Sequence, residues 1–328
     1  MNSSKIFLAI SAAAILAAIS YFWLVNPSDK KKLPAQVTAE KTVPKNSEVK
    51  QGAHVLPAFL ALQKLPTESP SLKLVRIYAT AKDKRNFFDD ARLQPEAGGA
   101  YLAYLAQSQC MLNVSKNSTN ASTIIRKIAL IPQDAPNRDE RIAAVRKIHE
   151  PCLGFDTSPI SYRKLKELIP EAVMANDPSY KALRAISASY EAGGDLSKVP
   201  DILEDAFKSG SPYALQNVLQ TISAATLNWA AYSNMIDGVE LQPQDAKAFI
   251  TATNLIACQF GIDCSASATP MLEFCTEGKC NLDPYQLAQE SGLTETEYAR
   301  LVLFHNQIVN AFQNGNFKII TVQKRVFR

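Results

Sequence analysis

The sequence predicts an all-α protein built as an array of short helical hairpins, an irregular bundle that resembles a helical repeat. The chain is rich in Ala, Leu and Ile and has only 12 Gly among its 328 residues. Alternation of apolar and polar residues, which is typical of strands, is scarce. Residues that begin and end helices recur instead at short intervals. These observations predict about ten or more short helices joined by short turns.

The first element is an uncharged apolar run over residues 6–25, preceded by Lys5. About 20 residues of helix, at ~1.5 Å per residue, span the ~30 Å hydrocarbon core of a bilayer. The aromatic cluster Tyr21–Trp23 suits the headgroup boundary at the end of such a span. We therefore expect residues 1–25 to be a membrane anchor. A cleaved signal sequence that ends near Ala18-Ile-Ser20 is the alternative, and a buried core helix is a third.

The orientation of this anchor is set by two opposing signals. Lys30, Lys31 and Lys32 follow the apolar run, and positive charges alone would keep this side in the cytoplasm. The six cysteines favour an oxidising compartment instead. Long domains are translocated despite flanking charges. We expect a single-pass inner-membrane protein with its C-terminal domain in the periplasm, or a soluble periplasmic or secreted protein if the segment is cleaved.

Residues 26–53 are predicted to be a flexible linker, because they are polar, aperiodic and rich in Lys, Glu, Pro, Ser and Thr. Residues 54–328 then form an α-helical, disulfide-containing domain. This domain is neutral overall, because four basic residues near its end offset a net charge of −4 in the rest. Nucleic-acid-binding domains usually carry a basic face, so no nucleic-acid partner is expected.

Helix ends within the domain can be placed from capping residues. An N-cap Ser or Asp followed by Pro begins a helix, as expected at Ser158-Pro159, Asp177-Pro178 and Ser211-Pro212. Gly210 ends the helix before Ser211. Thr294 and Glu297 match a capping box. Gly98-Gly99 follows Pro95-Glu96 and is expected in the first turn of a helix that runs to Cys110.

Apolar spacing supports these helices. Three sets of apolar residues share helical faces: Leu183, Ile186 and Tyr190; Ile202, Leu203, Ala206 and Phe207; Leu215, Val218 and Leu219. Residues 87–105 and 202–219 have the character of helical hairpins. The lone strand candidate is the tail, Phe317–Phe327, which is alternatively an extended segment packed on the last helix.

The six cysteines all lie beyond residue 100 and are expected to form disulfides. Two local loops, Cys258–Cys264 and Cys275–Cys280, would leave Cys110 to pair with Cys152. In the alternative pairing, which crosses between these two loops, Cys258 bonds to Cys275 or Cys280. The cysteine spacing is not a usual zinc pattern, and no Cys-x-x-Cys is present. We therefore expect no metal and no cofactor.

The placement of cysteine and glycine resembles that of uncharacterised exported, Cys-containing α-helical proteins of Gram-negative bacteria. The resemblance covers roughly residues 70–315 and rests on these stretches: Gln94–Tyr101 with Cys110, Cys152–Phe155, Cys258–Cys264 and Cys275–Cys280. No activity is known for that group, so the resemblance implies a periplasmic location and no site residues.

Few residues are candidates for catalysis. His149-Glu150 could activate Cys152 only if Cys152 were a free thiol. His305 lies on an apolar helix, where a packed histidine is the favoured interpretation, and His54 lies at the edge of the linker. Asp89-Asp90 and Glu96 could serve glycoside hydrolysis if they flanked a cleft, although a solvated helix face is favoured.

No recognised catalytic motif is present, so the catalytic residues stay unknown and the chain is more consistent with a non-enzyme. Asn113, Asn117 and Asn120 match the glycosylation sequon, which a polar loop also produces by chance. We expect a membrane-tethered scaffold that binds an envelope protein and reaches the membrane through residues 6–25. The alternatives are an envelope hydrolase that uses acidic residues and a small-molecule-binding periplasmic protein.

Overall fold

A computed structural model describes residues 69–112, 119–191, 193–228, 231–290 and 292–325 of the chain. The chain divides into two units, residues 1–58 and 59–328, and every described residue belongs to the second. The predicted anchor and linker therefore lie outside the described residues. Within the described residues, no helix combines the length and the apolar character needed to span a bilayer.

The described residues are mainly helical, which confirms the predicted all-α class. The first half contains α2 (Pro70–Thr80), α3 (Lys84–Ala91), η1 (Pro95–Ala97), α4 (Gly99–Leu112), α5 (Asn120–Ala129), α6 (Arg138–His149), η2 (Glu150–Cys152), α7 (Gly154–Thr157), α8 (Tyr162–Leu168) and α9 (Glu171–Met174). The second half contains α10 (Pro178–Tyr190), η3 (Leu196–Lys198), α11 (Val199–Lys208), α12 (Pro212–Thr226), η4 (Pro243–Asp245), α13 (Ala246–Gln259), α14 (Thr269–Thr276), α15 (Pro284–Glu290), α16 (Glu295–Gln313) and η5 (Phe317–Ile319). The elements marked η are short 3₁₀ helices.

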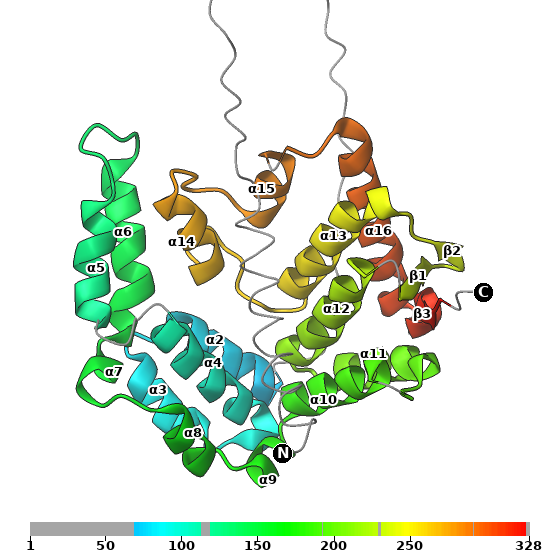
Figure 1. Ribbon diagram of the computed structural model, residues 1–328, viewed down its shortest axis with the longest axis horizontal. Coiled ribbons are helices and arrows are strands. Elements are labelled where there is room, and N and C mark those ends of the chain that lie inside the picture. The colour runs from blue at the N-terminus through cyan, green and yellow to red at the C-terminus, as the bar shows by residue number, and fades with distance from the viewer. Residues whose placement is uncertain (1–68, 113–118, 192, 229–230, 291, 326–328) are drawn as a thin grey trace, which may run out of the picture. The chain divides into compact units, whose positions relative to one another are not determined.

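Neighbouring helices pack as hairpins around two main cores (Figure 1). The predicted hairpins are present as α3 with α4 and as α11 with α12. The first core lies among α2 to α9 and includes Phe88, Leu102 and Phe155, which are almost fully buried. The second lies among α10 to the end of the chain and includes Phe249 and Phe312. A small third cluster joins α6 to α14.

Most of the expected helix starts are confirmed. The Asp177 side chain caps α10, that of Ser211 caps α12, and Thr294 forms a capping box with Glu297 at the start of α16. The start expected at Ser158 is wrong, because α8 begins after Ser161. The carbonyl of Ser158 accepts a hydrogen bond from the Arg85 guanidinium. Ser158 instead ends α7, and the Ser161 side chain caps α8 by accepting from the N–H of Lys164.

Two adjacent glycines end η1 and begin α4. Gly98 has a φ of +83°, a left-handed conformation that favours glycine. A Cβ atom on Gly99 would lie 2.1 Å from the carbonyl oxygen of Ala91, so only glycine allows this approach to α3. Gly99 is therefore in the first turn of α4, as expected, and Gly98 closes the turn before it.

A small antiparallel sheet completes the second core, with the strand order β2-β1-β3. The expected tail strand is present as β3 (Ile320–Lys324), and Val322 pairs with Asn234 of β1 (Tyr232–Ile236). The prediction of a lone strand is wrong, because β1 and β2 (Val239–Glu240) form a hairpin. Asp237 and Gly238 at its turn have φ angles of 51° and 75°. Asp-Gly favours such a turn, so the signal was present in the sequence.

The carboxylate of Asp177 joins the starts of two helices from different parts of the chain. One oxygen accepts hydrogen bonds from the N–H groups of Ser179 and Tyr180 in α10. The other accepts one of 2.8 Å from the N–H of Tyr101 in α4. Burial raises the pKa of Asp177, and the backbone donors act in the opposite direction. Asp177 thus caps α10 and also supplies an acceptor to the first turn of α4, which has no side-chain cap of its own from its chain neighbours.

Further buried polar contacts extend this junction to α12. The hydroxyl of Tyr101 donates to Asn217, and the amide of Asn217 donates to the carbonyl of Ser179. The hydroxyls of Ser179 and Ser211 lie 2.8 Å apart. These contacts connect α4, α10 and α12 at a single buried place between the two main cores.

We expect Asp177→Ala to lower the free energy of unfolding by about 3 kcal/mol, because it removes an N-cap and leaves buried N–H groups without acceptors. Asp283 is a matched control, because its carboxylate caps only α15. Asp283→Ala should cost about 1 kcal/mol. Urea denaturation of both variants measures the difference. Equal losses would show that the contact of Asp177 with α4 adds nothing.

The cysteines pair as Cys110–Cys152, Cys258–Cys264 and Cys275–Cys280. This arrangement is the local one expected from the spacing, not the crossed alternative. Cys110 and Cys152 are buried in the first core, where their disulfide links α4 to η2 across a sequence separation of 42 residues. The other two disulfides close loops with separations of 6 and 5 residues.

Replacing both Cys110 and Cys152 by Ala should destabilise the protein most among the three double replacements. The chain-entropy model gives about 4 kcal/mol for the long loop and about 2 kcal/mol for each short loop. Thermal melting of the three double variants tests the order. Equal shifts in the melting temperature would contradict it.

Candidate functional site

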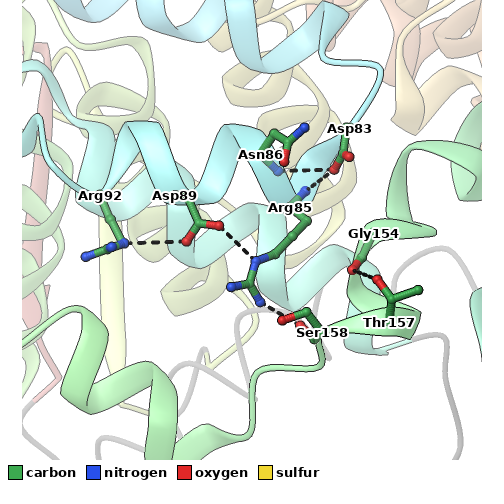
Figure 2. A network of polar contacts seen from close by, with 8 residues as sticks. All are labelled: Asp83, Arg85, Asn86, Asp89, Arg92, Gly154, Thr157 and Ser158. Atoms are coloured by element: carbon green, nitrogen blue, oxygen red, sulfur yellow. Dashed lines mark hydrogen bonds and ion pairs between the residues drawn. The ribbon is translucent and has the colours of Figure 1, made fainter.

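Of the acidic candidates, Asp89 and Asp90 lie on α3 and Glu96 lies in η1. Asp89 belongs to a network of polar contacts (Figure 2). Both carboxylate oxygens of Asp89 are engaged: one lies 3.0 Å from Arg85 Nε, and the other lies 3.7 Å from Arg92 Nε. Asp90 and Glu96 are exposed. The three carboxylates therefore form no paired acid and base, and Asp89 is a partner of two arginines.

Arg85 ties α3 to the end of α7. Its Nη1 donates a 2.6 Å hydrogen bond to the carbonyl of Ser158, as Figure 2 shows. Its guanidinium also lies 5.8 Å from the ring centres of Phe88 and Phe155. A Cβ atom on Gly154 would lie 2.8 Å from both Asp83 and Arg85, so α7 approaches the start of α3 closely. This network stabilises helix packing and offers no free acid for catalysis.

The proposed pairing of His149 with Cys152 as a base and nucleophile is wrong, because Cys152 is bonded to Cys110. His149 is the last residue of α6 and is 1% exposed. Its Nε2 is buried and has no hydrogen-bond partner. Burial, followed by the nearby charge of Lys127, lowers the pKa of His149 to about 4. The imidazole is therefore neutral near pH 7.

His305 is packed inside the protein, as the sequence predicts. Its Nδ1 lies 3.1 Å from the Asn306 side-chain oxygen, and its Nε2 lies 3.1 Å from the Gln259 amide nitrogen. The ring meets that of Tyr285 edge-on at 6.3 Å. Burial lowers the pKa of His305. The remaining histidine, His54, lies outside the described residues.

A buried lysine was missed by the sequence analysis. Lys84 in the first turn of α3 is 5% exposed, and its ammonium lies 3.6 Å from the ring centre of Tyr78. It also donates a hydrogen bond to the carbonyl of Tyr78. Burial lowers the pKa of Lys84 to about 8. No sequence feature indicates this burial, because Lys84 stands in a run of charged residues that is typical of an exposed turn.

A shallow hollow of about 280 Å³ lies beside the Cys258–Cys264 disulfide. It lies between the end of α13 and the start of α15, and its lining residues are Cys258, Gln259, Ile262, Cys264, Ser265, Asp283, Pro284 and Tyr285. Pockets for small ligands usually occupy ~300–1,000 Å³ and enclose the ligand. The hollow is therefore better suited to a few side chains than to a substrate. The sequence feature that could have indicated this hollow is the short loop between Cys258 and Cys264, which forms one of its walls.

The structure also places one of the three glycosylation sequons. The amide of Asn120 donates to the Cys152 carbonyl and to Asp156, and Asn120 is buried, so this sequon cannot carry a glycan in the folded protein. Asn113 and Asn117 lie outside the described residues.

Across residues 69–325, leaving out the gaps, no group of three or more His, Cys, Asp or Glu is arranged to hold a metal ion.

The fold and these sites define an all-α protein with three disulfides, in which Asp89, His149 and His305 contribute to helix packing. The chain has no match to a protein-family model, to a curated protein or to a solved structure.

We expect the stability of the protein to fall as the pH is lowered from about 6.5 to about 4. In the unfolded chain His149 titrates near 6.5, and in the folded protein near 4, so protons bind more tightly to the unfolded chain over this range. The total loss should be about 3 kcal/mol. Urea denaturation at several pH values, for the protein and for His149→Gln, isolates this contribution. Parallel pH profiles would contradict it.

Proposed function

We propose that this protein is a tethered scaffold of the bacterial cell envelope, held to the inner membrane through residues 6–25 with its helical domain in the periplasm. The observation that carries the proposal is the set of three disulfides in the domain that follows the apolar run. Disulfides persist in oxidising compartments and are rare in the cytoplasm. The resemblance to exported helical proteins of Gram-negative bacteria supports the same location.

The described residues favour binding over catalysis. Asp89 is neutralised by two arginines, and Cys152 is held in a disulfide. His149 and His305 are buried within the fold. A hydrolase needs an acid or nucleophile that faces a cleft, and these candidate residues do not supply one.

We propose that a partner binds to a surface on helix α5. It packs with α6 as a hairpin (Figure 1). Ile125 is 71% exposed and Leu130, directly after the helix, is 75% exposed, the highest values among the large apolar side chains of the described residues. Exposed apolar residues that share a surface are typical of interaction sites, and we propose that these two contact the same partner. We refer to Ile125 and Leu130 together as the α5 patch.

Affinity capture of the full chain from its own membranes tests both parts of the proposal. We expect the protein in the inner-membrane fraction, with all six cysteines protected until a reductant is added. A specific protein partner should co-purify with it. Recovery in the cytoplasm with free thiols would contradict the location, and the absence of any specific partner would contradict the scaffold role.

The double variant Ile125→Ser/Leu130→Ser should lower partner recovery about tenfold, because it removes the apolar contacts of the α5 patch. Leu93→Ser is the matched control, because Leu93 is 68% exposed and lies outside the patch. Equal recovery with both variants would show that the partner binds elsewhere.

A further inference from the structure

We propose that the hollow beside the Cys258–Cys264 disulfide is the docking site for the segment Phe59–Leu65 of the same chain. This inference does not depend on the proposed function. It implies that the domain has an intramolecular attachment point for the segment that precedes α2.

The chemistry of the hollow favours an apolar occupant. Its apolar wall consists of Ile262, Pro284 and the disulfide, with Tyr285 beside them. The polar groups of the lining bond largely among themselves. The Gln259 amide donates to the Tyr285 hydroxyl at 2.8 Å, and the carboxylate of Asp283 accepts from the N–H of Tyr285. A polar ligand would have to compete with these bonds, whereas apolar side chains would not.

The first turn of α2 contacts the loop that forms one wall of this hollow. Ser69 is held at the start of α2, because its hydroxyl donates to the carbonyl of Gly210 and accepts from the N–H of Leu72. Leu72 packs against Gly261, where a Cβ atom would lie 2.5 Å from the leucine Cδ1. Gly261 directly precedes Ile262 of the lining. The first turn of α2 is thus in contact with the loop that forms one wall of the hollow.

The segment has the length and composition to reach the hollow and fill it. Leu65 precedes Ser69 by four residues, which span at most ~14 Å, and Phe59 precedes it by ten, which span at most ~35 Å. Phe59, Leu60, Leu62 and Leu65 are apolar, and the one charged residue of the segment is Lys64. Asp283 lines the hollow, and its negative charge complements that of Lys64.

Hydrogen exchange on the full chain tests this docking. In the variant Phe59→Ser/Leu60→Ser, backbone amides of residues 258–265 and 283–290 should exchange about tenfold faster, because the cover over the hollow is weakened. Val43→Ser, in the polar linker, is the matched control and should change neither region. Unchanged exchange in the double variant would overturn the proposal. Protection that rises with protein concentration would also overturn it, because it would identify a second copy as the occupant.

A cross-linking experiment covers the case in which the double variant does not fold. A photoreactive phenylalanine analogue at position 60 of the full chain should cross-link to residues 258–265 or 283–290 within the same molecule. The substitution Ile262→Glu should reduce this yield severalfold, because it places a charge in the apolar wall. Cross-links confined to other regions, or to other protein molecules, would overturn the proposal.

Discussion

The buried carboxylate of Asp177 connects the two main cores, and the packing of three helices, α4, α10 and α12, depends on where it lies. It accepts hydrogen bonds from the starts of α10 and α4. Tyr101 and Asn217 extend the junction to α12. Helix starts carry unsatisfied N–H groups and a partial positive charge, so one anion can serve two of them. Gly98 lies at the same junction, because a Cβ atom added to it would lie within 4.0 Å of the hydroxyls of Ser71, Ser179 and Ser211.

Disulfides complement this junction, because the helices are short. Isolated helices of fewer than about 12 to 15 residues are marginal in water, and most of the helices described here are shorter than that. Cys110–Cys152 joins α4 to the turn after α6, in the first core. The two short disulfides fix the loops around α13 and α14 instead. The Cys258–Cys264 loop also positions Ile262 and Gly261, which connect the hollow to the first turn of α2.

Several residues that could carry chemistry are used for packing. Asp89 and Arg85 hold α3 against the end of α7, and His149 is enclosed at the end of α6. Burying His149 and Lys84 lowers the pKa of both side chains, which has a cost in stability that a purely apolar core would avoid. The α5 patch and the hollow are the surfaces at which we propose that the protein accepts a partner and another part of its own chain.

The sequence by itself determined the local structure. It predicted the all-α class, the caps at Asp177, Ser211 and Thr294, and the short disulfide loops, because each depends on residues a few positions apart. The turn at Asp237-Gly238 was equally local and could have been predicted. Only the tertiary structure decided that Asp177 also serves α4, 76 residues away, and that Arg85 engages the carbonyl of Ser158. Such bonds join groups that are distant in sequence, and their partners are set by how whole helices pack, so no local pattern encodes them.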